Sequence, residues 1–196
     1  MDSLSLTQFP LLAQYTDDMT LQIALGQLSP SINETDKVYV DRVLQVLHRR
    51  HKNDPILVGE DHTRKLAIVH EVTRRIARKE LPDNRMTHIE RICAFRHGAF
   101  FADEADFDIL RDRLTTLLKE IECSLLAPIV LFVDDLHNLI GTQNEKTQNI
   151  GRAFVTAHVR GEMQFIGATT LGNYQQYLAT SALWPFEQHS QAIFIE

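Results

Sequence analysis

The chain has 196 residues, of which 44% are hydrophobic and 23% charged, and its formal net charge at pH 7 is −6. This length and apolar content suit one α/β domain with a sizeable core. The acidic balance argues against a nucleic-acid binder, and no apolar run is long enough to cross a membrane. The first basic residue is Lys37, so we expect no secretory signal and a cytoplasmic location, with Cys93 and Cys123 as reduced core thiols.

The first 36 residues contain acids but no Lys or Arg. Apolar side chains recur at roughly helical spacing from Leu11 to Leu25, and Gly26 ends the pattern. We therefore predict that residues 1–36 form a helical arm and linker, and that residues 37–196 form the main domain.

An amphipathic helix is predicted over residues 37–52, with Arg49, Arg50 and Lys52 in its last turn, where cations suit the helix dipole. The sequence Asn53-Asp54-Pro55 ends this helix. Two interpretations of the basic cluster remain open: a solvated helix end, or a contact with another subunit or a ligand.

Strands alternate with helices along the rest of the chain. We predict helices over residues 65–80, 109–122, 147–160 and 171–178, and strands over residues 56–58, 89–95, 129–133, 163–168 and, at an edge, 192–195. This alternation predicts a mainly parallel sheet covered on both faces. Ligands bind such sheets at the carboxyl ends of the strands, which are occupied here by Gly59, Asp134, Asp135, Thr169 and Thr170.

The segment 59–66 follows a short apolar strand and precedes a helix, as a phosphate-binding loop does. A working loop reads G-x-x-x-x-G-K-[ST]. Gly59 and Lys65 are in place, but the second glycine is Arg64 and the Mg²⁺-binding hydroxyl is Leu66. Asp61 adds a negative charge where phosphate would lie. Alone, this is a weak motif that chance can supply.

A second element is the apolar run 129–133 followed by Asp134 and Asp135. In P-loop ATPases the first acid orients Mg²⁺, and the second, normally Glu, positions the attacking water. The alternative is that the two acids cap a helix after a buried strand. H-E-x-x-H, G-x-S-x-G and C-x-x-C patterns are all absent from the sequence, which argues against the enzyme and zinc-site classes that use them.

Four separated blocks, residues 15–20, 43–60, 131–141 and 160–174, occur in the order and spacing of one family. The chain resembles, over about residues 12–196, the first ATPase domain of the Clp/heat-shock AAA+ unfoldases, including their secretion-associated members. The resemblance implies a three-layer P-loop NTPase (AAA+) fold, α/β, with a five-stranded parallel sheet flanked by helices. Such domains form ring hexamers that bind ATP between subunits and pull polypeptide through a pore.

The departures from the family pattern are as specific. The adenine-side Ile-Gly-Arg becomes Ile32-Asn33-Glu34, and the pore-loop region, residues 100–106, is acidic. Phe100 and Phe101 either grip a peptide or pack inside. The arginine finger expected shortly after Leu183 is replaced by Trp184-Pro185-Phe186-Glu187, where exposed aromatics would suit an interface or fill a gap left by the lid subdomain. We expect that lid subdomain to be absent.

We therefore expect a degenerate Clp-type AAA+ domain, a pseudo-ATPase with little or no ATP hydrolysis and no bound cofactor. It would be a structural or regulatory protein whose partner is an AAA+ unfoldase, another protein or a second copy, and neither nucleic acid nor membrane. The vestigial nucleotide-binding residues would be Gly59, Glu60, Lys65 and Thr170.

The alternative is a divergent ATP-binding ATPase or unfoldase domain. Lys65 would contact phosphate, Asp134 would orient Mg²⁺, Asp135 would position water, and Thr170 would sense the γ-phosphate. A third hypothesis is a peptide-binding module that uses the loop carrying Phe100 and Phe101 without ATP.

Overall fold

Six strands form one sheet in the order β1-β3-β4-β5-β2-β6 in the computed structural model of the chain. The model describes residues 6–28, 31–81, 89–102, 106–123, 128–140, 145–179 and 189–196. The strands are β1 Thr16–Asp18, β2 Asp54–Val58, β3 Arg91–Phe95, β4 Ile129–Val133, β5 Gln164–Thr169 and β6 Ser190–Phe194. Every neighbouring pair is parallel except β1 and β3. The predicted mainly parallel sheet is confirmed, with β6 as an edge strand.

The sixth strand corrects the predicted count of five. The stretch expected to be helical from Leu11 to Leu25 is divided into α1 Pro10–Tyr15, β1, and α2 Met19–Ala24. α1 ends where Thr16 becomes extended, and the Asp18 side chain caps α2 by accepting a hydrogen bond from Leu21 N at 2.9 Å. The short polar segment between the two helices pairs antiparallel with β3.

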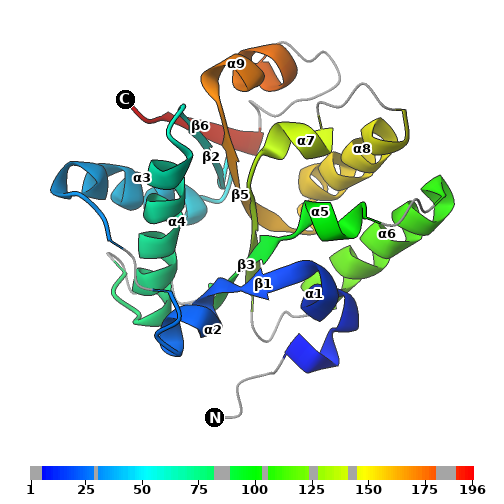
Figure 1. Ribbon diagram of the computed structural model, residues 1–196, viewed down its shortest axis with the longest axis horizontal. Helices are drawn as coiled ribbons and strands as arrows, with labels where there is room; N and C mark the ends of the chain where they lie inside the picture. The colour runs from blue at the N-terminus through cyan, green and yellow to red at the C-terminus, as the bar shows by residue number, and fades with distance from the viewer. Residues whose placement is uncertain are drawn as a thin grey trace.

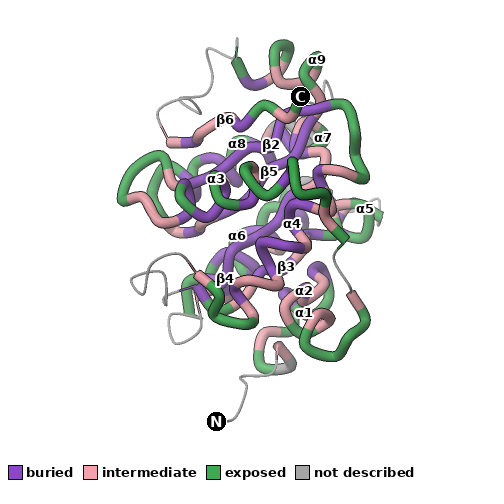
Figure 2. The backbone as a smooth tube through the Cα atoms, turned by 90° about the vertical axis from the view of Figure 1, so that its left-hand side faces the viewer, coloured by how far each residue is buried: buried purple, intermediate pink, exposed green. Residues whose placement is uncertain are grey.

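Helices cover both faces of the sheet, which Figure 1 shows nearly edge-on. On one face lie α2, α3 Lys37–Leu47 and α4 His62–Ala77, and on the other lie α1, α5 His97–Phe100, α6 Phe107–Cys123, α7 Leu136–Ile140 and α8 Glu145–Val159. Each face has its own apolar core, centred on residues such as Leu44 and Ile68, or Phe154 and Phe165. The strands between the two cores are mostly buried (Figure 2).

The first main helix ends earlier than predicted. α3 stops at Leu47, five residues before the expected end at Lys52, so the basic cluster lies in the turn that follows. Lys52 adopts a φ of +52°, a left-handed conformation that a helix cannot contain. The strand β2 also begins earlier, at Asp54, so the chain must leave the helix in time to enter the sheet.

Other boundaries shift by a few residues. α4 begins at His62, three residues before the predicted start, and the predicted helix 171–178 is a short α9, Leu171–Asn173, followed by a π-helical turn, Tyr174–Ala179. Short 3₁₀ turns lie at Leu6–Gln8 and Glu34–Asp36. Of the two cysteines expected in the core, Cys93 is buried and Cys123 is exposed at the end of α6.

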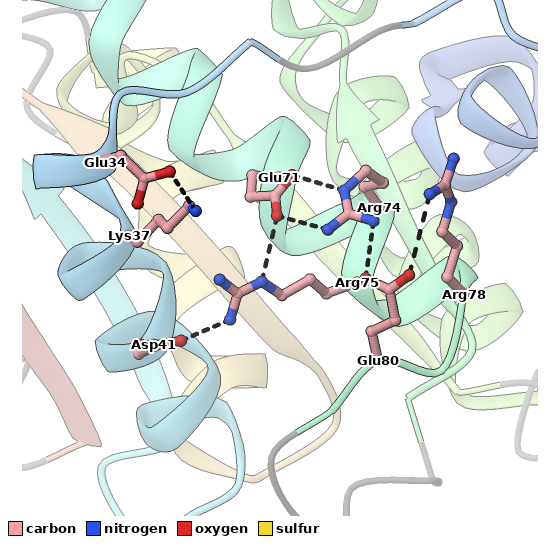
Figure 3. A network of polar contacts seen from close by, with 8 residues as sticks. All are labelled: Glu34, Lys37, Asp41, Glu71, Arg74, Arg75, Arg78 and Glu80. Atoms are coloured by element: carbon pink, nitrogen blue, oxygen red, sulfur yellow. Dashed lines mark hydrogen bonds and ion pairs between the residues drawn. The ribbon is translucent and has the colours of Figure 1, made fainter.

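A network of charged side chains ties α3 to α4 (Figure 3). Glu71 accepts hydrogen bonds from Arg74 at 2.7 Å and from Arg75 at 3.2 Å, and Arg75 reaches Asp41 on α3 at 2.5 Å. Hydrogen bonding from Arg74 lowers the pKa of the Glu71 carboxyl. The network thus joins the two helices.

Candidate functional site

The predicted nucleotide-site residues gather at one edge of the sheet, at the carboxyl ends of β2, β4 and β5. Gly59 follows β2, and its N–H donates to Thr169 O at 3.1 Å. A Cβ added at Gly59 would meet Ile195 Cβ at 3.2 Å, so the absence of a side chain lets the segment after β6 approach closely. In this structure the glycine serves strand packing.

The loop between β2 and α4 is short because α4 already begins at His62. Asp61 is the N-cap of this helix, and its Oδ1 accepts from Arg64 N at 3.0 Å. Asp61 O accepts from Lys65 N at 3.2 Å. A phosphate-binding loop needs free amides that point at the ligand. Here the Asp61 side chain occupies one of them, as a bound anion would.

Lys65 is the loop residue expected to reach phosphate, yet it is only 2% exposed. Its Nζ donates to Gly59 O at 2.7 Å and to Thr169 O at 3.0 Å. The ammonium therefore ties the start of α4 to the ends of β2 and β5.

Arg64, at the position of the second glycine, forms an ion pair with Asp36. Its Nε and Nη2 donate to Asp36 Oδ1 at 2.9 and 2.6 Å, and the Asp36 side chain is 2% exposed. The guanidinium also lies 5.5 Å from the Tyr39 ring centroid and donates to Glu196 O. The hydrogen bond with Asp36 raises the pKa of Arg64 above its ordinary value. Arg64 thus joins α4 to the start of α3 and to the end of the chain.

Asp134 and Asp135 follow β4 and lead into α7. Asp134 Oδ1 accepts from Asp135 N at 2.9 Å, and Asp134 Oδ2 lies 3.4 Å from His62 Nδ1. Asp135 has a φ of +45°, and its carbonyl accepts from Asn138 N at 2.7 Å. The backbone contact of Asp135 is that of a helix start, and Asp134 is partly exposed beside the loop after β2.

Thr170 and Glu60 organise the loop after β5. Thr170 caps α9 by accepting from Asn173 N at 3.3 Å, and Glu60 Oε1 accepts from Leu171 N at 3.1 Å. Thr169 Oγ1 lies 3.4 Å from His137 Nδ1. Burial lowers the pKa of His137, so the ring is neutral at pH 7. Glu60 and Thr170 therefore both bind the start of α9.

Sequence reasoning missed three residues of this site: Asp36, His62 and His137. Asp36 carries no motif, and nothing in the segment 59–66 or the block 131–141 marks His62 or His137, so only the fold shows that these residues meet Arg64, Asp134 or Thr169. The described residues include no group of three or more His, Cys, Asp or Glu side chains able to hold a metal ion.

Two further predicted regions differ in how far the structure describes them. Phe100 is fully buried and packs against Tyr15 and Phe95 with ring centroids 5.3 and 5.4 Å apart, so the packing interpretation holds for that ring. The segment 184–187 in place of the arginine finger, and residues 103–105 of the pore-loop region, lie outside the described residues.

The residues at this edge do not fit Mg²⁺-ATP as the fold family binds it. The cradle amide of Arg64 is bonded to Asp61, the Lys65 ammonium is bonded to two carbonyls, and the hydroxyl position holds Leu66. Leucine offers no oxygen to Mg²⁺.

The three-layer arrangement and the loop after β2 define the class: the chain has the fold of an AAA+ P-loop NTPase domain. It is homologous to one region of the ClpB and Hsp104 chaperones over about 95% of its length. No family model matches the chain.

The curated relatives include ClpB of Bdellovibrio bacteriovorus, 34% identical over 190 residues, which are 96% of this chain and 21% of that protein. ClpB of Pseudomonas putida is 34% identical over 186 residues, or 94% of this chain and 21% of that one. The chain thus spans about a fifth of the length of these relatives.

Solved structures agree with this homology. Closed-state Hsp104 with ATPγS and FITC casein matches with a TM-score of 0.79 and 31% identity, covering 95% of this chain and 31% of that one. The Saccharomyces cerevisiae Hsp104–ADP complex also has a TM-score of 0.79, with 32% identity, and covers 94% of this chain and 30% of that one.

Proposed function

We propose that this Clp-type AAA+ domain has lost ATP hydrolysis and acts as a structural or regulatory protein that docks on a protein partner. The observation that carries the proposal is the reuse of the phosphate-binding loop by the chain itself. Asp61 caps α4, Arg64 pairs with Asp36, and Lys65 holds two carbonyls. These three residues of the loop all have partners within the chain.

Phosphate would have to break these contacts before it could bind. Hydrogen bonds to charged groups contribute about 1.5–3 kcal/mol each, and every 1.4 kcal/mol is about a tenfold loss of affinity. Displacing Lys65 from Gly59 O and Thr169 O therefore weakens a nucleotide complex by at least about tenfold. The carboxylate of Asp61 adds repulsion at the same place.

The partner is proposed to be a protein: an AAA+ unfoldase, another protein or a second copy of this chain. In support, the homologous Hsp104 structures include complexes with casein. Among the described residues, no helix is long and apolar enough to cross a membrane. We also propose the division at residue 36 between arm and domain, although β1 of the arm is paired with β3.

One arrangement favours a second candidate, a divergent ATP-binding domain. Asp134 is partly exposed, and it lies on the same sheet edge as Lys65 and Thr170. In that case Lys65 would have to exchange its carbonyl partners for phosphate, and Asp134 would have to leave His62 for Mg²⁺.

Titration with a fluorescent ATP analogue and Mg²⁺, together with a phosphate-release assay, separates the two candidates. We expect no saturation at micromolar nucleotide and no release above the rate without protein. Asp134→Asn is the site variant, and Asp112→Asn, an exposed carboxylate on α6, is its matched control. Micromolar binding that Asp134→Asn weakens and Asp112→Asn leaves unchanged would establish the ATP-binding candidate instead.

A further inference from the structure

A cavity of about 840 Å³ opens at the edge of the sheet opposite to the nucleotide position. It is lined by the first residues of three strands, Asp54 of β2, Ile129 of β4 and Gln164 of β5. Gly59 and Thr170 follow the other ends of two of these strands. At about 3.3 Å per residue, the five-residue length of β2 separates the two regions by roughly 15 Å.

The mouth of this cavity carries the basic cluster whose role the sequence left open. Arg50, His51 and Lys52 line the cavity and are exposed. Within the part of the chain that the structure describes, none of the three makes a side-chain hydrogen bond or ion pair. They differ in this from Arg64, Arg74 and Arg75, which all have carboxylate partners. The cations at the mouth are thus available to a ligand.

The turn that carries these cations is fixed to the sheet. Gln164 Nε2 donates to Leu47 O and to Asn53 O, both at 2.9 Å, and so holds both ends of the turn. Arg49 Nη1 donates to Gln191 Oε1 at 3.3 Å. Lys52 is held in the left-handed region at a φ of +52°. Because the turn is fastened at three points, a ligand need not order it on binding.

The wall beneath the mouth adds no net negative charge. Asp54 Oδ2 lies 3.2 Å from His158 Nδ1, and both side chains are 2% exposed. Burial raises the pKa of Asp54 to about 8 and lowers the pKa of His158 to about 4, so both groups are neutral at pH 7. The buried pair therefore does not repel an anion.

Two glutamate side chains also line the cavity. Glu162 is paired with Arg160 at 3.7 Å, and Glu122 is exposed. Arg50 and Lys52 then face one unpaired carboxylate, which leaves the mouth net positive in a chain of net charge −6.

We propose that this cavity binds a small multivalent oxyanion, a polyphosphate or polycarboxylate, held by the side chains of Arg50 and Lys52. The volume falls within the range of about 300–1,000 Å³ typical of small-molecule sites. The planar guanidinium of Arg50 matches two oxygens of a phosphate or carboxylate, and the Lys52 ammonium adds a point charge. The site is separate from the vestigial nucleotide position.

Isothermal titration of the folded chain with tripolyphosphate and, separately, with propane-1,2,3-tricarboxylate tests the proposal and tells the two chemistries apart. The site variant is Arg50→Gln with Lys52→Asn, since asparagine tolerates the left-handed backbone at this position. The matched control is Arg42→Gln with Arg78→Gln, which removes two exposed charges from α3 and the end of α4. Circular dichroism checks that each variant folds.

We expect at least one probe to bind, with affinity reduced about tenfold or more in the site variant and unchanged in the control. His51 and His189 line the cavity and His62 lies at the opposite edge, so the ring resonances of His51 and His189 should shift in NMR spectra and those of His62 should not. The proposal is overturned if neither probe binds, if both double variants bind equally, or if the shifts appear at His62.

Discussion

Restoring the family glycine at position 64 should destabilise this protein. Asp36 is 2% exposed, and among the described residues Arg64 is the side chain that neutralises it. Breaking a buried ion pair costs about 3–5 kcal/mol because one charge stays buried alone. Arg64 is 26% exposed, so water partly replaces it and we take about 2 kcal/mol. A glycine inside a helix costs about 1 kcal/mol more.

Arg64→Gly should therefore lower the free energy of unfolding by about 3 kcal/mol. For a domain of this size, about 2–4 °C per kcal/mol gives a fall in Tm of roughly 6–12 °C. Urea denaturation and calorimetry measure both quantities. Arg42→Gly, at an exposed arginine in α3, should show only the helix cost of about 1 kcal/mol. Equal losses for the two variants would refute a stabilising Arg64–Asp36 pair.

Three other changes test further parts of the structure. Lys65→Met keeps the length of the side chain but leaves Gly59 O without its ammonium donor. Urea denaturation should therefore show a free energy of unfolding lower by about 1–3 kcal/mol, and unchanged stability would contradict this. In the native state Asp54 keeps its proton up to about pH 8, whereas in the unfolded state it loses the proton near its ordinary pKa of 3.8. The free energy of unfolding should therefore fall as the pH rises from about 3.8 to about 8. Burial lowers the pKa of His158 to about 4, so this residue opposes the trend below about pH 6.5. The fall in the free energy of unfolding should therefore be visible in unfolding curves from about pH 6.5 to 8. It should disappear in Asp54→Asn. Phe100→Ala should cost about 3–5 kcal/mol, because the ring is fully buried among aromatics; a stable variant with weakened peptide binding would instead favour a gripping role.

The sheet was predictable because uniformly apolar runs are typical of buried strands. Ile129 to Val133 is uniformly apolar, and it is a strand buried at every position. The strand β1 was not predictable from periodicity, because its three residues are polar and it is flanked by apolar residues at helical spacing. The early end of α3 was missed for a related reason: Arg49, Arg50 and Lys52 suit a helix end, but the sheet requires a turn there.

The sequence predicted which strand ends meet at the candidate site, but not the contacts made there. Gly59, Asp134 and Thr170 lie at one edge of the sheet because each follows the carboxyl end of a strand, as the alternation of elements indicated. The partner of Arg64 could not be inferred, because Asp36 lies 28 residues away and carries no motif. Long-range pairs of this kind depend on helix packing, which a single sequence does not reveal.

Asp61 and Arg64, in the segment after β2, both make contacts that stabilise the fold. A glycine at position 61 would remove the helix cap, and one at position 64 would leave Asp36 buried without its cation. A hydroxyl at position 66 would supply the oxygen that the G-x-x-x-x-G-K-[ST] pattern provides, but Arg64 N would still be bonded to Asp61. Losing the cap at position 61 or the ion pair at position 64 therefore carries a stability cost of about 1–3 kcal/mol. Because both changes are unfavourable, we expect the loop after β2 to persist as a structural element of the fold.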